Sequence, residues 1–241
     1  PVAGSSGTPC NGANTRARIR FPFIPSVVKR ATRDERYRKG GFEWGDKQTL
    51  VAEVARDTME KGGFKSVLDV GCGYGRDCIY LARAGFDVVG IDVSAEALKL
   101  ARDWAKGDGL KIDFMHMDIT DNSFEGSRFD TVIMFNTFHF MLEKVRERTV
   151  SEIYRILREG GVLVQAMFSR GEKGFGQGRE VEANTFECKP GRPVHFFSEE
   201  EIRDAFAGFT IERLDEVAIH EVHQDGNEHF HREWLMVGEK R

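Results

Sequence analysis

The sequence predicts an α/β fold, with a doubly wound, mostly parallel sheet and helices on both faces. Short apolar runs typical of buried strands alternate with longer segments of helical periodicity. The chain has 241 residues, 40% of them hydrophobic and 31% charged, which is enough to bury one core of this kind. Parallel strands need crossover helices, and the spacing allows them. The strands are expected at residues 65–70, 87–91, 111–115, 129–135 and 162–167.

The first 41 residues are expected to form a basic, flexible leader ahead of one domain at residues 42–241. Residues 1–40 hold nine lysines and arginines against two acids, whereas the whole chain carries a formal charge of −4. That overall charge gives no general attraction to nucleic acid or to anionic membranes. A trimmed targeting segment and a basic binding arm are the alternatives for the leader.

The first strand runs into a loop with glycines at every second position, Gly71, Gly73 and Gly75, and Asp69 stands within the strand. Glycines allow a sharp turn and let a ligand approach bare main chain. The helix expected over residues 76–83 begins with amide groups that lack intrahelical partners. The loop is therefore predicted to bind a ligand.

The second strand ends in Asp92, about 20 positions after the glycines, where an acid can accept hydrogen bonds from two ribose hydroxyls. A dinucleotide fingerprint would require glycine where Arg76 stands, which disfavours a nicotinamide cofactor. The pattern D-x-G-x-G-x-G instead resembles the first motif of the class I S-adenosylmethionine (SAM) dependent methyltransferases, which have a Rossmann-like fold. A glycine-rich turn in an unrelated α/β protein is the alternative.

The resemblance implies SAM as cofactor and a seven-stranded sheet closed by an antiparallel hairpin. It places Asp118 against the adenine amino group and Ile119 over a face of the ring; a helix cap is the alternative role for Asp118. Asp69 could hold the glycine loop or reach the methionine amine through water. The expected cofactor-binding residues are Asp69, Gly71, Cys72, Gly73, Gly75, Asp92, Val93, Asp118, Ile119 and Asn136.

Two polar residues follow the fourth strand at the tip where this family places the reactive methyl group. Asn136 offers a carbonyl to the SAM amine or to the acceptor, and His139 is a candidate base that could instead simply pack. A base is needed only where the acceptor must first lose a proton. The N-P-P-Y motif of DNA base-amino methyltransferases is missing here, which argues against DNA as acceptor.

The segment from Ser169 to Pro193 breaks the strand–helix rhythm with five glycines and no clear period. Long irregular loops in compact domains tend to be functional. We expect residues 169–195 to form an acceptor-side loop, with Arg192 and His195 contacting the substrate. Solvated surface positions are the alternative for both side chains.

The remaining helices and the C-terminal end have recognisable signals. Asp46, Ser94 and Ser198 are expected N-caps, and Tyr37 and Trp44 are candidates for a lid over the cofactor. A hairpin around residues 225–227 ends the chain. The ending resembles that of tellurite-resistance methyltransferases. Four C-terminal histidines suggest a metal site only weakly, so no metal is expected: His220, His223, His229 and His231.

The resulting hypothesis is a cytoplasmic methyltransferase for a small-molecule acceptor, acting as a monomer or homodimer. Four cysteines without a C-x-x-C pair indicate free thiols in a reducing compartment. The sequence has no apolar run of membrane-spanning length. Two alternatives stay open: a methyltransferase for RNA or another nucleic acid that uses the basic leader on phosphates, and a SAM-binding protein without catalysis.

Overall fold

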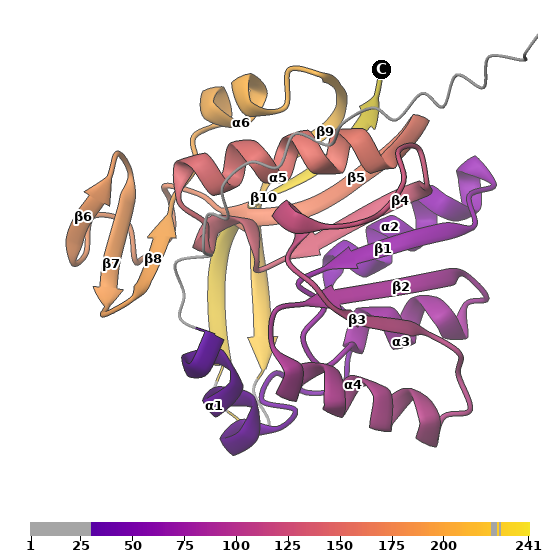
Figure 1. The fold of residues 1–241 in the computed structure, drawn as a ribbon. Helices are drawn as coiled ribbons and strands as arrows, with labels where there is room; N and C mark the ends of the chain where they lie inside the picture. The colour runs from indigo at the N-terminus through magenta and orange to yellow at the C-terminus, as the bar shows by residue number, and fades with distance from the viewer. Residues whose placement is uncertain (1–29, 223–225, 227) are drawn as a thin grey trace, which may run out of the picture.

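The computed structural model describes residues 30–222, 226 and 228–241 (Figure 1). The elements in chain order are α1 Arg30–Gly40, α2 Leu50–Gly62, β1 Ser66–Val70, α3 Arg76–Arg83, β2 Asp87–Asp92, α4 Ala95–Gly107, β3 Asp113–His116, η1 Ile119–Asp121, β4 Phe129–Phe135, η2 Phe138–Phe140, α5 Glu143–Ile156, β5 Leu157–Phe168, β6 Arg179–Glu182, β7 Thr185–Lys189, β8 Arg192–His195, α6 Glu199–Ala205, β9 Phe209–Val222 and β10 Glu228–Lys240.

The main sheet has seven strands in the order β3-β2-β1-β4-β5-β10-β9. The pairings among β1 to β5 are parallel, and β10 runs antiparallel to both β5 and β9. This confirms the predicted doubly wound sheet with an antiparallel C-terminal hairpin. The strand order reverses between β1 and β4, and ligands of such sheets bind beyond the carboxyl ends of the strands at that point.

Two apolar cores lie on opposite faces of the sheet, because successive strand residues point to opposite sides. Val67 of β1 packs into the core under α2, α3 and α4. The next residue, Leu68, packs into the core under α5 and α6. Figure 1 shows α5 and α6 on one side of the sheet, with α3 and α4 on the other.

Helix α2 begins later than the sequence indicated, since its cap is Thr49 and not Asp46. The Thr49 hydroxyl accepts a hydrogen bond from Ala52 N, and it also donates to Asp77 Oδ2 at 2.7 Å. Asp77 Oδ1 accepts from Thr49 N at 2.8 Å. A cap directly precedes the first helical residue. The buried Asp77, 28 positions further along the chain, holds Thr49 in the cap position and so determines where α2 begins.

Helix α5 ends at Ile156, and β5 then starts without a loop. The strand was expected only from residue 162, but it begins at Leu157, and Gly160 and Gly161 both lie inside it. A Cβ on Gly161 would stand 2.8 Å from Arg158 O and 3.0 Å from Asp130 O, so close strand packing explains the glycine there.

The segment from Ser169 to Pro193 contains three short antiparallel strands in the order β6-β7-β8, where an irregular loop was expected. An aromatic cluster supports this small sheet: Phe186 lies 5.5 Å from Phe175 and 6.1 Å from Phe196 between ring centroids. Strands of four or five residues are too short for a period-2 pattern to stand out. Figure 1 shows the small sheet beside the main one.

Helix α1 lies within the expected leader and packs on α4. Asp34 Oδ1 accepts from Ser94 Oγ at 2.6 Å, and Arg38 pairs with Glu96 at 3.0 Å. The folded body thus begins before residue 42, whereas residues 1–29 lie outside the described part of the chain. Among the described residues, no helix has the length and apolar character needed to cross a bilayer.

Candidate active site

The loop between β1 and α3 is held in a conformation that favours glycine. Gly71, Gly73 and Gly75 all have positive φ, at 78°, 56° and 84°. A Cβ on Gly71 would overlap the side chain of Thr137. The loop is also fixed to β2, because Gly71 N donates to Ile91 O at 2.8 Å. The backbone therefore turns tightly and leaves bare main chain toward the cavity described below.

Asp92 at the end of β2 is 5% exposed and lines that cavity. Its Oδ2 accepts from Gly73 N at 2.9 Å and its Oδ1 accepts from Ser94 N at 2.8 Å. The carboxylate thus holds both the glycine loop and the start of α4. The next residue, Val93, is half-buried, and its carbonyl oxygen lies 2.9 Å from His116 Nε2.

Asp69 lies under the loop and outside the set of residues lining the cavity. It is 4% exposed, and its Oδ2 accepts from Cys78 Sγ at 3.2 Å, which supplies the partner that a buried acid requires. Burial, reinforced by the negative charge of Asp77, raises the pKa of Asp69 well above its usual range. Its neighbour Cys72 does line the cavity, and burial raises the pKa of that thiol to about 11.

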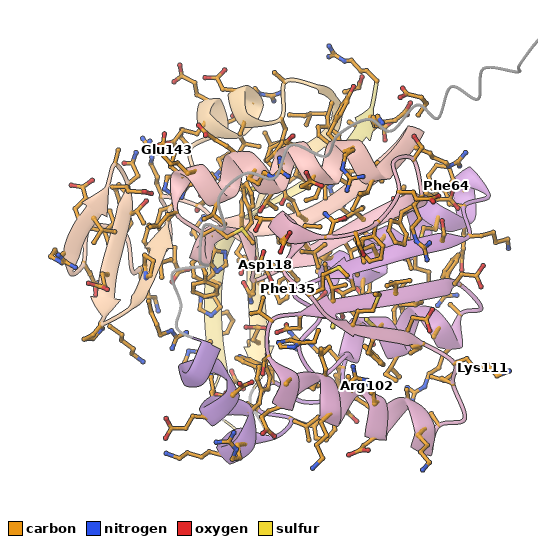
Figure 2. All side chains as sticks on the ribbon, in the orientation of Figure 1. Phe64, Arg102, Lys111, Asp118, Phe135 and Glu143 are labelled. Carbon is orange, nitrogen blue, oxygen red and sulfur yellow. The ribbon has the colours of Figure 1, made fainter. Side chains whose placement is uncertain are left out.

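Asp118 performs the capping role that the sequence left open. Its Oδ1 accepts from Thr120 N at 3.0 Å and from Thr120 Oγ1 at 2.8 Å, at the start of η1. Its Oδ2 is buried without a hydrogen-bond partner among the described residues, and Ile119 is 4% exposed. Figure 2 labels Asp118 and also Phe135, the last residue of β4.

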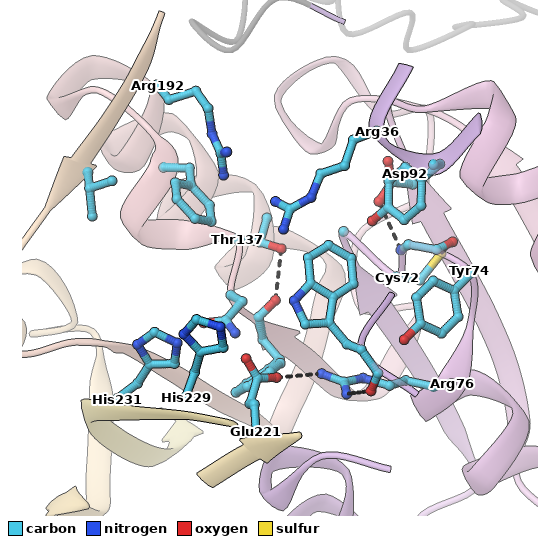
Figure 3. A pocket seen from close by; sticks show the side chains of 18 of the residues that line it. Arg36, Cys72, Tyr74, Arg76, Asp92, Thr137, Arg192, Glu221, His229 and His231 are labelled. Carbon is cyan, nitrogen blue, oxygen red and sulfur yellow. Dashed lines mark hydrogen bonds and ion pairs between the residues drawn. The ribbon is translucent and has the colours of Figure 1, made fainter. Parts of the chain in front are cut away.

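A cavity of about 690 Å³ opens beyond the carboxyl ends of the strands (Figure 3). Its size falls within the usual range for small-molecule sites. Seven parts of the chain form its wall: α1 and the following turn, the glycine loop with the start of α3, the end of β2, the β4–η2 segment, the end of β5, the small sheet and the C-terminal hairpin. The lining includes Arg36, Tyr37, Trp44, Gly71, Cys72, Gly73, Arg76, Asp92, Phe135, Asn136, Thr137, Phe140, Phe168, Lys189, Arg192, Glu221, His229 and His231.

Both residues expected as a lid line the cavity. The Tyr37 hydroxyl would lie 2.8 Å from a Cβ on Gly73, so this side chain covers the glycine loop. Trp44 stacks on Tyr74 with ring centroids 6.2 Å apart, and the guanidinium of Arg36 lies 4.4 Å from the Trp44 ring centroid. The segment around α1 therefore closes one side of the site.

The tip of β4 presents Asn136 to the cavity in an uncommon backbone conformation. Asn136 has φ of 48°, and its Oδ1 is buried without a hydrogen-bond partner among the described residues. Next to it, Thr137 Oγ1 donates to Phe135 O at 3.0 Å. An acceptor oxygen placed in this way can meet a donor on a bound molecule.

The other half of the cavity is aromatic and basic. Phe140 and Phe168 line it, and the Arg192 guanidinium lies 5.9 Å from the Phe140 ring centroid. His229 and His231 reach it from β10, as Figure 3 shows. Arg192 thus lines the cavity, and its contact with a substrate stays a prediction, whereas the sequence suggested a metal site for the two histidines only weakly.

An ion pair links the glycine-loop helix to the hairpin. Arg76 donates to Glu221 Oε1 at 2.9 Å and to Trp44 O at 3.0 Å. The Arg76 and Glu221 side chains are 16% and 8% exposed. Glu221 was not identified from the sequence, because it lies 145 residues from its partner and in no local pattern.

Seven predicted site residues are not among those that line the cavity: Asp69, Gly75, Val93, Asp118, Ile119, His139 and His195. His139 is fully buried, and its ring stacks on Phe168 with centroids 3.9 Å apart. His195 is 3% exposed and its Nδ1 lies 2.8 Å from Thr185 Oγ1. Burial, together with the positive charge of Arg146, lowers the pKa of His195 to about 4. His139 thus supports a cavity residue from behind, and His195 faces a separate hollow beside α5 and α6.

Within the part of the chain that the structure describes, no group of three histidine, cysteine or acidic side chains is arranged to hold a metal ion. His223, one of the histidines considered, lies outside those residues. Cys72, Cys78 and Cys188 are free thiols, and Cys10 also lies outside the described part.

The profile of the family described as "Methyltransferase domain" matches residues 67–161. A putative methyltransferase of Geobacillus sp. is 39% identical over 105 residues, covering 42% of both chains. A ubiquinone biosynthesis O-methyltransferase of Cereibacter sphaeroides is 31% identical over 130 residues, or 53% of this chain and 52% of the relative. An uncharacterized methyltransferase of Schizosaccharomyces pombe is 34% identical over 110 residues, or 45% of this chain and 75% of the relative. The chain spans about half the length of the first two.

A nucleic-acid enzyme also matches: a tRNA N(3)-methylcytidine methyltransferase of Drosophila melanogaster is 29% identical over 163 residues, covering 62% of this chain and 50% of the relative. Among solved structures, one from work on thioacetal formation during echinomycin biosynthesis has a TM-score of 0.67 and 27% identity, over 87% of this chain and 92% of the other. TehB of Haemophilus influenzae has a TM-score of 0.62 and 17% identity, over 87% and 67%, which shows a shared fold.

The glycine loop, Asp92 at the second strand tip and the seven-stranded sheet thus occur in a chain whose relatives are methyltransferases. This chain belongs to the class I SAM-dependent methyltransferases. Its site also fits the cofactor chemically. Asn136 Oδ1, on the cavity wall, is a buried acceptor without a donor among the described residues, and SAM carries amino groups that could supply one. Asp118 Oδ2 is a second such acceptor, outside the cavity lining.

Proposed function

We propose that this enzyme transfers the methyl group of SAM to a small, acidic acceptor with a flat apolar body. The observation that carries the proposal is the composition of the acceptor half of the cavity. Phe140 and Phe168 provide aromatic surface, and Arg192 extends over the Phe140 ring beside them. Such a wall suits a planar molecule that bears a carboxylate.

The cofactor half has the groups that SAM requires. Asp92 would accept the ribose hydroxyls beside the main chain of Gly71 and Gly73, while Asp118 and Ile119 would meet the adenine. When bound, SAM supplies a methyl group on a sulfonium that a nucleophile displaces in line. The protein therefore has mainly to orient the two molecules and exclude water. Asn136, directly after β4, also lines the cavity and would contact the SAM amine or the acceptor.

The positive charge on the acceptor side comes from the small sheet. Lys189 and Arg192 come from β7 and β8 and line the same cavity. We assign anion recognition to Arg192. We also propose that the glycine-rich segment 169–195 covers the bound acceptor.

The relatives support a small acceptor without identifying it. A ubiquinone biosynthesis O-methyltransferase is among them, and the echinomycin-related structure shares most of the chain. Their names describe reactions of small molecules. The size of the cavity, about 690 Å³, is consistent with room for a small acceptor beside the cofactor.

The test is formation of S-adenosylhomocysteine from SAM with a panel of benzoates, comparing wild type with Arg192→Gln. Loss of a charge-assisted hydrogen bond should raise the Michaelis constant about tenfold or more, with SAM affinity unchanged. Arg179→Gln is the matched control, because Arg179 lies on the exposed surface of the same small sheet and pairs with Glu187. Equal Michaelis constants for both variants, or no turnover of any small acid by wild type, would reject the proposal.

A second candidate function is methylation of RNA. The tRNA methyltransferase relative favours it, together with the excess of basic residues at positions 1–40. RNA binding by that segment should be strongly salt-dependent. Turnover of a tRNA transcript that is lost when residues 1–29 are removed would favour this function over the first.

A further inference from the structure

We propose that His231 is the base that takes the proton of the acceptor, that Glu172 positions it, and that the acceptor atom is the oxygen of an aromatic hydroxyl. This inference rests on the proposed function and narrows its substrate class. It concerns two residues to which the sequence gave no catalytic role, one on β10 and one in the turn after β5.

Glu172 is fixed behind His231 by the backbone. Its Oε2 accepts from Arg232 N at 2.7 Å, and its own N–H donates to Ser169 O at 3.1 Å, which closes the turn after β5. The other oxygen, Oε1, lies 3.5 Å from His231 Nδ1. The Glu172 side chain is 9% exposed. The carboxylate therefore has one oxygen anchored and the other directed at the imidazole.

The imidazole is oriented so that its second nitrogen faces the cavity. Nδ1 of His231 is buried on the Glu172 side, whereas the side chain as a whole keeps 23% of its surface exposed and lines the cavity. The exposed edge is thus the one that carries Nε2. Phe168 stacks on the ring with centroids 5.1 Å apart and an interplanar angle of 26°. Figure 3 shows His231 extending from β10 toward the half of the cavity that holds Arg192.

This arrangement is the one expected of an oriented base. A carboxylate next to Nδ1 favours the tautomer with the proton on that nitrogen and leaves the Nε2 lone pair available. It also stabilises the imidazolium that forms. Burial alone would raise the pKa of Glu172, but the interaction with His231 and the hydrogen bond from Arg232 N outweigh it, and the pKa is lowered. Glu172 is therefore an anion at neutral pH.

Other polar groups of the cavity are less suited to the role. Glu221 is paired with Arg76 at 2.9 Å, and Asp77 accepts two hydrogen bonds from Thr49. His229 is exposed to solvent. It lies parallel to His231, with ring centroids 6.0 Å apart.

The step is a single displacement with proton transfer. The acceptor oxygen forms a bond to the methyl carbon of SAM, and the carbon–sulfur bond breaks with both electrons going to sulfur. The hydroxyl proton moves to Nε2 of His231, which later releases it to water. The products are the methyl ether and S-adenosylhomocysteine, and no oxidant or reductant is needed.

The need for a base identifies the acceptor class. An aromatic hydroxyl with a pKa near 10 is mostly protonated at neutral pH, so it gains from a proton acceptor. An aryl thiol ionises more readily and reacts as the thiolate without help. Phe140 and Phe168 provide the surfaces on which an aromatic ring can stack. The combination favours a phenol over a thiol.

The experiment measures methyl transfer to 4-hydroxybenzoate and to 4-mercaptobenzoate by the full chain, with His231→Gln, Glu172→Gln and the control His220→Gln. His220 lies on the exposed hairpin beside Glu228, outside the cavity. His231→Gln should lower kcat for the hydroxyl probe about a hundredfold and leave the thiol probe within about threefold. Glu172→Gln should show the same selectivity with a loss of about tenfold. SAM affinity should be unchanged in all three variants.

Several results would overturn the inference. Equal losses of activity on both probes in His231→Gln would mean a structural role for His231. No loss on either probe would mean that His231 is not the base. A wild-type enzyme that methylates the thiol but not the hydroxyl would leave the small-molecule function standing and refute the phenol class. If neither probe is methylated while SAM binds, the acceptor class is wrong. Failure of SAM to bind at all would instead refute the underlying function.

Discussion

Replacing Asp92 with asparagine should weaken SAM binding and loosen the glycine loop together. Both carboxylate oxygens already accept buried backbone hydrogen bonds, from Gly73 N and Ser94 N. An asparagine provides one oxygen and one NH₂ group, so one of those amides would face a donor. An unsatisfied buried donor costs about 1–3 kcal/mol of stability. Loss of charge-assisted bonds to the ribose costs about 1.5–3 kcal/mol of binding, or roughly 10- to 150-fold in affinity.

The control is Asp87→Asn, the same substitution at the exposed start of the same strand. Its effect on stability should stay within about 0.5 kcal/mol. Isothermal titration calorimetry with SAM and urea unfolding measure the two effects separately. If Asp92→Asn binds SAM within about threefold of wild type while Asp87→Asn behaves as expected, Asp92 does not hold the ribose.

Two further substitutions test the packing around the site. Glu233 is buried, and burial with the nearby charges of Glu221 and Glu172 raises its pKa well above its usual range. The wild type should therefore lose about 1.4 kcal/mol of stability per pH unit between the unfolded pKa, about 4.3, and the folded one. Glu233→Gln should not lose this stability. The difference in free energy of unfolding between the variant and the wild type should therefore grow with pH, and a constant difference would contradict a raised pKa of Glu233. Gly71→Ala should abolish SAM binding, since its Cβ would overlap Thr137, whereas Gly85→Ala has a similar positive φ of 89° and open space, and should cost only about 1–2 kcal/mol of stability.

The fold could be predicted because its signals are local. The alternation of strands and helices, the cap at Ser94 and the capping box of Ser198 with Glu201 all appear within a few residues of sequence, and the structure contains them. Thr49 was missed because its role depends on the distant Asp77. The small sheet β6–β8 was missed because its strands are short and its packing comes from aromatic residues spread over the segment.

The candidate site likewise has one half that could be predicted from local sequence and one half that could not. The glycine loop and Asp92 lie in one local pattern, so their positions followed from the sequence. The acceptor half is assembled by β10, β8 and the turn after β5, and no local pattern joins His231 to Glu172. His139 looked like a base because it follows a strand tip. Its burial against Phe168 depends on where β5 ends, which the sequence does not specify.

A crystal structure of the complex with S-adenosylhomocysteine tests the central claim most directly. The account predicts the ribose hydroxyls on Asp92, the adenine near Asp118 and Ile119, and the sulfur directed past Asn136 toward the space between Phe168 and Arg192. That space should stay open to an acceptor. A product that lies away from the glycine loop, or that fills the half lined by Arg192 and His231, would contradict the account.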